Sequence, residues 1–411
     1  MHYRYLGLFL FVNAICANIA TAKQPVLLDD NLTDTIMLGK SFFSVPWVLS
    51  PSSTTARDGL GPLHNANSCI SCHPKLKSAN FLNKKNQIAK SNIIKISKDK
   101  TYGIQIATQG SINVPYEARI KISYEEVDFY FPDGERVILQ KPTIILQDLQ
   151  YGNLEQNTNL SLRRSPSVLG LGTIEDINQE DILANEDILD EDKDGISGKA
   201  NRIFSPINKQ YEIGKFTAKA SSSSLLHQTT RAAREDMGLT SVFLPKENCT
   251  LHQIACNQFA TKKGFDISQK RLEAITTYLQ TRKKPYQQTS HLSVGKKLFS
   301  TLGCAKCHIE NISKANTKKA SIYSDFLLHD MGKGLSDEVS EFDAKGNEWR
   351  TAPLWGIGAR QKEAKYLHDG RARTLQEAIL WHKGEATQAM QNYAHLPKKQ
   401  RQEIINFLKR L

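Results

Sequence analysis

The chain has few residues of the kinds that mark fibrous, disordered or membrane proteins. It holds 24 Gly and 14 Pro in 411 residues, which excludes collagen-like and low-complexity classes. No stretch approaches the roughly 20 apolar residues that a membrane-spanning helix needs, so we expect no transmembrane span. With 40% hydrophobic and 23% charged residues, the composition is globular, and the length favours two or three domains.

The chain also lacks the signatures of nucleic-acid binding. Its formal net charge is +12, but the basic residues are spread along the sequence rather than clustered. We find no helix-turn-helix, zinc-finger or aromatic-rich RNA-binding pattern, and therefore expect no nucleic-acid partner. An acidic partner protein and an anionic membrane surface both remain compatible with this charge.

The N-terminus predicts export. Arg4 precedes the short apolar stretch of residues 6–12, and Ala20-Thr21-Ala22 has the small-x-small pattern of a cleavage site. These features are typical of a secretory signal peptide over residues 1–22, which predicts a periplasmic protein.

Cysteine is scarce, and its spacing is informative. Four of the 7 cysteines lie in Cys69-Ile70-Ser71-Cys72-His73 and Cys304-Ala305-Lys306-Cys307-His308. This pentapeptide is the attachment signature of c-type haem, in which two thiols bond to the vinyl groups and the adjoining His lies beneath the iron. We expect two covalently bound haem c groups, with His73 and His308 as proximal iron ligands. In an exported chain, Cys249 and Cys256 are expected to form a small disulfide loop.

Apolar residues recur at helical spacing just before the second signature and at the end of each half of the chain. It predicts a mainly α fold of two cytochrome c-like haem domains, at residues 23–285 and 286–411. The apolar positions are Leu272, Ile275, Tyr278 and Leu279, then Val294, Leu298, Phe299 and Leu302, and finally Ile404, Ile405, Leu408 and Leu411.

A strand pattern interrupts the N-terminal half. Apolar and polar residues alternate from Ala118 to Tyr124, and Pro132-Asp133-Gly134 predicts a turn. We therefore expect a β insertion over about residues 97–150 in the N-terminal haem domain. Beyond it, Arg163 and Arg350 begin two similar segments, and we expect both guanidinium groups to bind haem propionates, with solvated surface arginines as the alternative.

An acidic run after this repeat has the spacing of a calcium loop. Asp190, Asp192 and Asp194 alternate before Gly195, as in oxygen-rich Ca²⁺ sites. The twelfth position is Asn201 rather than Glu, so a complete EF-hand is absent. A bound calcium and a plain acidic surface turn are both open.

Several short segments together carry a family resemblance. From about residue 57 onward the chain resembles the di-haem oxidoreductases, a peroxidase-like family sometimes labelled thiol oxidoreductases, and is more distantly similar to bacterial di-haem cytochrome c peroxidases. The resemblance implies two cytochrome c-like domains that face each other. The segments are 59–62, 65–69, Asp194-Gly195-Ile196-Ser197-Gly198, 236–241, His329-Asp330-Met331-Gly332, 349–353 and Tyr366-Leu367-His368-Asp369-Gly370-Arg371.

The resemblance also suggests axial ligands for the C-terminal haem. In di-haem peroxidases the distal Met of this haem follows a His-x-Gly turn by fourteen residues, and the fourteenth position after His368 is His382. His382 also lies on the apolar face of a predicted helix, Thr374–Glu385. We expect His308 and His382 to ligate the iron, with Met331 as the alternative sixth ligand.

In the N-terminal domain the resemblance is looser. Asp236 matches the peroxidase glutamate that moves a proton between the two peroxide oxygens, and Gln228 matches its orienting amide. The spacing is two residues shorter, and Asp reaches less far than Glu. His227 and His64 are the candidate distal residues for this iron.

The function expected from these features is that of an exported di-haem c-type oxidoreductase. Electrons from a redox partner protein would pass from the C-terminal haem to a peroxidase-like N-terminal haem that acts on hydrogen peroxide. Two alternatives are open: a non-catalytic electron carrier with two six-coordinate haems, and a di-haem enzyme that modifies a partner protein.

Overall fold

The computed structural model describes residues 30–77, 91–259, 264–285, 287, 293–312, 321–358 and 365–411. The predicted signal peptide, residues 1–22, lies outside the described residues. No helix in the described part of the chain combines the length and the apolar character needed to cross a membrane.

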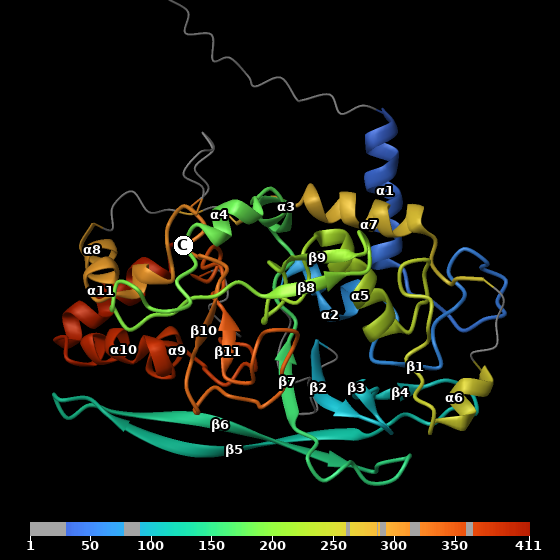
Figure 1. Ribbon diagram of the computed structural model, residues 1–411, viewed down its shortest axis with the longest axis horizontal. Helices are drawn as coiled ribbons and strands as arrows, with labels where there is room; N and C mark the ends of the chain where they lie inside the picture. The colour runs from blue at the N-terminus through green and yellow to red at the C-terminus, as the bar shows by residue number, and fades with distance from the viewer. Residues whose placement is uncertain are drawn as a thin grey trace, which may run out of the picture.

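Helices and small antiparallel sheets alternate along the chain (Figure 1). The α-helices are α1 (Asp30–Ser44), α2 (Cys69–Cys72), α3 (Leu171–Glu175), α4 (Gln179–Leu183), α5 (Leu225–Met237), α6 (Ile254–Phe259), α7 (Gln269–Gln280), α8 (Ser293–Thr301), α9 (Leu375–Leu380), α10 (Thr387–Ala394) and α11 (Lys398–Leu408). Short 3₁₀ turns are η1 (Pro74–Leu76), η2 (Cys304–Lys306) and η4 (Gly384–Ala386). The strands are β1 (Leu63–His64), β2 (Asn92–Asp99), β3 (Gly103–Gln105), β4 (Gln109–Gly110), β5 (Arg119–Tyr130), β6 (Arg136–Gln147), β7 (Leu160–Arg164), β8 (Arg202–Ser205), β9 (Gln210–Ile213), β10 (Leu328–Asp330) and β11 (Glu348–Arg350).

Helix predominates, with 30% of the described residues against 19% in strands, but strands also form outside the predicted insertion. β2 starts at Asn92 and pairs with β7 from Asn92 to Ile96, so the three-stranded sheet β3-β2-β7 reaches both sides of the expected range of about 97–150. Ile94 and Leu162 are buried at this pairing. The alternation in these two short strands was too brief to be read from the sequence alone.

The predicted closing helices are confirmed. In the N-terminal half α1 packs against α7, where a Cβ on Gly39 would lie 1.9 Å from the carbonyl oxygen of Ala274. In the C-terminal half α8 packs against α11, and a Cβ on Gly295 would lie 2.4 Å from the carbonyl oxygen of Glu403. Glycine therefore allows the close approach of both helix pairs.

The predicted turn at Pro132-Asp133-Gly134 closes a long two-stranded hairpin, β5–β6. Its strands pair in register from Arg119 opposite Gln147 to Tyr130 opposite Arg136. The hairpin runs along one side of the molecule, below both halves of the chain (Figure 1). Phe131 at its tip is buried in the C-terminal core with Tyr393. The insertion thus links the two halves.

One helix is shorter than predicted. The range Thr374–Glu385 contains α9, whose N-terminus is capped because the Thr374 hydroxyl accepts a hydrogen bond from the Glu377 backbone N–H. α9 ends at Leu380, since the chain then turns through Gly384, which has φ +57° and packs against the carbonyl oxygen of Asp330. His382 lies just beyond the helix end.

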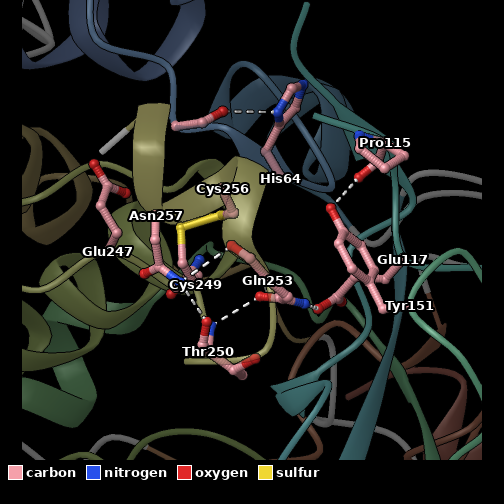
Figure 2. The surroundings of a disulfide bond; sticks show 12 residues. His64, Pro115, Glu117, Tyr151, Glu247, Cys249, Thr250, Gln253, Cys256 and Asn257 are labelled. Carbon is pink, nitrogen blue, oxygen red and sulfur yellow. Dashed lines mark hydrogen bonds between the residues drawn. A yellow bond between two sulfur atoms is a disulfide. The ribbon is translucent and has the colours of Figure 1, made fainter. Parts of the chain in front are cut away.

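The predicted disulfide is confirmed between Cys249 and Cys256. The loop that it closes lies against the β insertion (Figure 2). Gln253 in this loop is fully buried and donates a hydrogen bond to Glu117, and Glu117 in turn accepts one from the Ala107 backbone N–H. The disulfide loop therefore supports the segment that follows β3.

Candidate haem and acid–base sites

The first Cys-x-x-Cys-His signature forms the single turn α2 followed by His73. The His73 Nδ1–H donates a hydrogen bond of 2.9 Å to the carbonyl oxygen of Pro166, 93 residues along the chain. Burial lowers the pKa of His73 to about 4, so the ring is neutral near pH 7. With Nδ1 occupied by a carbonyl, the lone pair of Nε2 is free to bind a metal.

The second signature repeats this arrangement. Cys304 begins η2, and the His308 Nδ1–H donates 2.9 Å to the carbonyl oxygen of Tyr323. Burial lowers the pKa of His308 to about 4 as well. The four thiols of the two signatures are free of disulfides, and burial raises the pKa of Cys69 and of Cys304 to about 12.

His382 has the same bonding pattern as the two signature histidines. Its Nδ1–H donates 2.7 Å to the carbonyl oxygen of Ala378, and burial lowers its pKa. The charge of a protonated His382 would lower the pKa of His308, so the two rings lie close enough to interact. The structure thus brings together the two predicted ligands of the C-terminal iron, each with Nε2 available.

Met331, the alternative ligand, lies on the neighbouring loop. It is partly buried against the C-terminal core, and its backbone N–H is bonded to Asn347. The next residue, Gly332, packs against Lys383 and Gly384, directly after His382. Both candidate sixth ligands therefore lie in the same region of the molecule.

The two predicted propionate arginines differ in their contacts. Arg163 forms an ion pair of 2.9 Å with Asp337, but its Nη1 is buried without a hydrogen-bond partner in the described chain. Arg350 donates to the carbonyl oxygens of Thr217 and Thr351. Burial lowers the pKa of Arg350 to about 10, and the charge of Asp325 acts in the opposite direction. Each arginine thus has capacity for a further carboxylate.

His368, from the His-x-Gly turn, is stacked on Trp349 with ring centroids 3.5 Å apart. Arg163 and Lys219 both lie 4.2 Å from the Trp349 ring. Burial and the nearby cations hold the pKa of His368 well below its usual range. This stack joins β7 to the C-terminal half, because the Arg164 backbone N–H donates to the carbonyl oxygen of His368.

Asp236 lies near the end of α5 and close to Cys69, whose pKa its charge raises. Burial raises the pKa of Asp236 to about 6. The amide bonded to its carboxylate is that of Gln105 in β3, with Nε2 donating 2.9 Å to Oδ1. Gln228, the amide expected at this place, instead accepts a hydrogen bond from Ser222. Nothing in the sequence pattern distinguished Gln105, because its position depends on how the insertion folds back.

The candidate distal histidines are both buried. His227 lies on α5 with Nδ1 3.4 Å from the Ser223 hydroxyl, and burial lowers its pKa to about 4. His64 Nδ1 donates to the carbonyl oxygen of Gly61 and lies close to the disulfide loop (Figure 2).

The acidic run brings together a different set of carboxylates from the predicted one. Asp187, Asp190 and Asp192 place oxygen atoms within 4.8 Å of one another. Asp194 instead pairs with Lys306 of the second haem signature at 2.9 Å. Asp187 precedes the alternating pattern, which is why the sequence did not indicate it.

A buried histidine cluster behind the second signature was also missed. His329 lies between Asp325, at 2.9 Å from Nε2, and Glu385, at 2.7 Å from Nδ1, and beside Cys307. Hydrogen bonds to both carboxylates hold the pKa of His329 well above its usual range. Glu385 also accepts from the Ser197 backbone N–H, so this cluster fixes the acidic segment to the C-terminal half.

A family model described as "Di-haem oxidoreductase, putative peroxidase" matches residues 101–411. No curated protein matches. Among solved structures, a hydrazine synthase of Kuenenia stuttgartiensis pressurised with xenon is 15% identical, covering 97% of this chain and 99% of its own, with a TM-score of 0.36.

The matched family segment contains the second haem signature, His382, Asp236 and both arginines, and it begins after the first signature. It covers well over half of the chain. The resemblance seen in the sequence is therefore confirmed, and the chain belongs to the di-haem oxidoreductase family.

Proposed function

We propose that this protein is an exported di-haem c-type oxidoreductase that reduces hydrogen peroxide with electrons from a redox partner protein. Bound to the two signatures, haem would supply electron transfer in the C-terminal half and redox chemistry on peroxide in the N-terminal half. The N-terminal and C-terminal haem units are proposed to follow the predicted boundary at residue 285.

The main support for this proposal is that three histidines share the same hydrogen bonding and the same protonation state. His73, His308 and His382 each use Nδ1 to donate to a backbone carbonyl, and burial keeps each ring neutral. A neutral imidazole whose orientation is fixed by a hydrogen bond from Nδ1, and whose Nε2 is free, is the form that binds iron. These residues, with the two cysteine pairs that form no disulfide, fit two haem groups.

The two arginines also fit haem. A propionate is a carboxylate, and it would pair with the free Nη1 of Arg163 or further stabilise the buried charge of Arg350. We propose these arginines as propionate partners, as the sequence predicts.

Asp236 is the proposed acid–base group. Its pKa of about 6 lets the carboxyl group hold a proton or release one near neutral pH, which a general acid–base residue requires. Its position beside Cys69 places it next to the first haem signature. We propose that Asp236 takes a proton from bound peroxide and returns it to the departing oxygen.

The proposal is tested first by mass spectrometry of the exported protein after proteolysis. Peptides that contain residues 69–73 and 304–308 should each carry the mass of one haem through thioether bonds, which survive acid–acetone treatment. Extraction of either haem by acid–acetone would contradict c-type attachment at that signature.

Calcium binding remains part of the proposal, with a changed ligand set. Asp187, Asp190 and Asp192 are the carboxylates that meet, and Asp194 is proposed to fix the loop through Lys306 rather than to bind the ion.

A further inference from the structure

Two large apolar side chains are exposed on the acidic segment, residues 180–194, which begins in α4. Ile188 is 52% exposed and Leu189 is 80% exposed. They line a hollow of about 750 Å³ together with the carboxylates of Glu191 and Asp192. An exposed apolar surface with polar groups around it is typical of a site that binds another protein.

The β8–β9 hairpin continues this apolar surface. Phe204 and Tyr211 are 43% and 75% exposed, and their ring centroids lie 5.7 Å apart. Arg202 precedes Phe204 by two positions, on the same face of β8, and pairs at 2.8 Å with Glu186, which lines the hollow. The exposed aromatic pair therefore lies beside the hollow.

Hydrogen bonds hold the acidic segment in this form. The Asp187 carboxylate accepts from the Glu191 backbone N–H at 2.9 Å, and the Asp187 backbone N–H donates to the carbonyl oxygen of Gly198. Just beyond the segment, Glu385 accepts hydrogen bonds from the backbone N–H and the hydroxyl of Ser197. The exposure of the two apolar side chains thus belongs to the folded structure.

The acidic segment also reaches the second haem signature. Asp194 pairs at 2.9 Å with Lys306, whose side chain is 46% exposed. Lys306 lies between Cys304 and Cys307, to which the C-terminal haem is proposed to be bonded, so one edge of that haem belongs to this signature. Electron transfer between two proteins slows steeply with distance. A donor that binds at the hollow is therefore on the side of the molecule where electrons would enter this haem.

The charge of the acidic segment is opposite to that of the whole chain, which is +12. Residues 180–194 contain eight acidic side chains and one lysine, a net charge of −7. Arg202 and Lys306 each pair with one of these carboxylates, which brings the charge to −5, and a calcium ion at the proposed site would leave −3. The hollow keeps a negative rim in either case and attracts a positively charged protein.

We propose that the hollow and the aromatic pair beside it bind the electron donor, a small redox protein with basic side chains around an apolar contact. This inference rests on the proposed electron transfer from a partner protein, and it names the surface where electrons enter and the chemistry of the partner. Electron-transfer pairs bind weakly through small interfaces, so a surface of this kind is sufficient.

The test measures how fast a reduced donor passes an electron to the haem-loaded protein, with calcium present throughout. The probe is a strongly basic cytochrome c with one haem, and an acidic cytochrome with one haem is the comparison. The basic donor should react faster, and its rate constant should fall as ionic strength rises, because salt screens the attraction of opposite charges. The charge of the whole chain, +12, would favour the acidic donor instead.

Two exposed positions of the surface are then changed. Leu189→Ser removes the apolar centre, and Glu191→Lys reverses a charge at the rim without altering the proposed calcium ligands. We expect each substitution to lower the rate constant with the basic donor about fivefold at low ionic strength. The effect of Glu191→Lys should disappear at high ionic strength, whereas that of Leu189→Ser should persist.

Matched controls change exposed residues of the same types elsewhere. Leu251→Ser lies on the disulfide loop, where Leu251 is 93% exposed. Glu126→Lys lies on the β5–β6 hairpin, which Figure 1 shows on the side of the molecule opposite α4. Both should leave the rate constant unchanged. A faster reaction with the acidic donor, or equal effects of the controls and the two surface variants, would overturn the inference.

The outcomes separate the inference from the function on which it rests, because the rate of electron entry is measured without peroxide. If the basic donor reduces the wild type as expected but peroxide is not consumed, the proposed function fails and the donor surface stands. If peroxide is consumed with a small artificial reductant and neither surface variant slows the basic donor, only the inference fails.

Discussion

His382 is the residue on which the account of the C-terminal haem depends. Its free Nε2 and its proximity to His308 predict a six-coordinate, low-spin iron. Substituting His382→Ala should open this position, giving a high-spin signal in EPR and tight cyanide binding. Met331→Leu should leave the EPR spectrum and the cyanide binding unchanged. The opposite pattern would make Met331 the ligand.

Asp236 should control the pH dependence of the peroxide reaction. Because the pKa of Asp236 is about 6, its carboxylate is available above that pH, and the rate should rise as pH increases through 6. Asp236→Asn should lower the rate by about a hundredfold or more and remove this rise. Stopped-flow measurements between pH 5 and 8 would test this, and an unchanged profile would exclude Asp236 as the base.

The raised pKa of Asp236 also predicts how the stability of the folded protein depends on pH. Burial raises the folded-state pKa of Asp236 above its ordinary value, so the protonated form favours folding. Its contribution is present below about pH 4 and is lost as pH rises to about 6. Asp236→Asn should therefore raise the Tm at pH 7 and leave it unchanged at pH 4. A lower Tm at pH 7 would contradict the direction of this pKa.

At the scale of residues, the sequence predicted those whose chemistry lies in a contiguous pattern. The Cys249–Cys256 disulfide is of this kind and is confirmed. The haem-attachment cysteines and both proximal histidines are of this kind too, and their roles stay predictions. Residues that act through long-range packing were not predictable. Gln105 reaches Asp236 from 131 positions away, and Glu385 reaches His329 from 56. Both contacts depend on how segments fold back, which local periodicity does not encode.

Among the elements, the β5–β6 hairpin is held to the C-terminal half by Arg401. Its guanidinium group is 3% exposed, pairs with Asp133 and Glu135 at the hairpin tip, and lies 3.9 Å from the Phe131 ring. Arg401→Ala should lower the free energy of unfolding by about 2 kcal/mol, because the buried Arg401 side chain loses its contacts with the Phe131 ring and with the carbonyl oxygen of Leu396. Arg136→Ala, which removes an exposed pair with Asp128 on the same hairpin, should cause no measurable change in urea denaturation. Equal effects of the two substitutions would mean that the tip does not anchor the hairpin.

The acidic loop between α4 and β8 gives a prediction for calcium. Millimolar Ca²⁺ should raise the Tm of the wild type, since an ion bound only by the folded state stabilises it. Asp190→Asn should abolish this gain, whereas Asp194→Asn should keep it, because Asp194 pairs with Lys306. Calorimetry with Ca²⁺ and with a chelator distinguishes the two. No gain in the wild type would make the loop an acidic surface turn.

The whole molecule is more interlocked than two consecutive domains would suggest. Ile322 and Phe326 of the C-terminal half are buried in the N-terminal core, and Phe131 of the insertion is buried in the C-terminal core. Arg163 and Arg231 lie within ion-pair distance of Glu341 across the same junction. Helical periodicity predicted the elements that close each half, whereas these crossings join segments far apart in the chain. The predicted boundary between the two haem domains, at residue 285, stays a prediction.

The most direct test of the central claim is EPR of the exported, fully oxidised protein, repeated after half-reduction and after addition of hydrogen peroxide. The account predicts a low-spin signal from the haem with His308 and His382. It also predicts a high-spin signal from about half of the haem, which changes while peroxide is consumed. Two low-spin signals that neither half-reduction nor peroxide alters would contradict it, and the protein would then be an electron carrier in which Asp236 has no catalytic role.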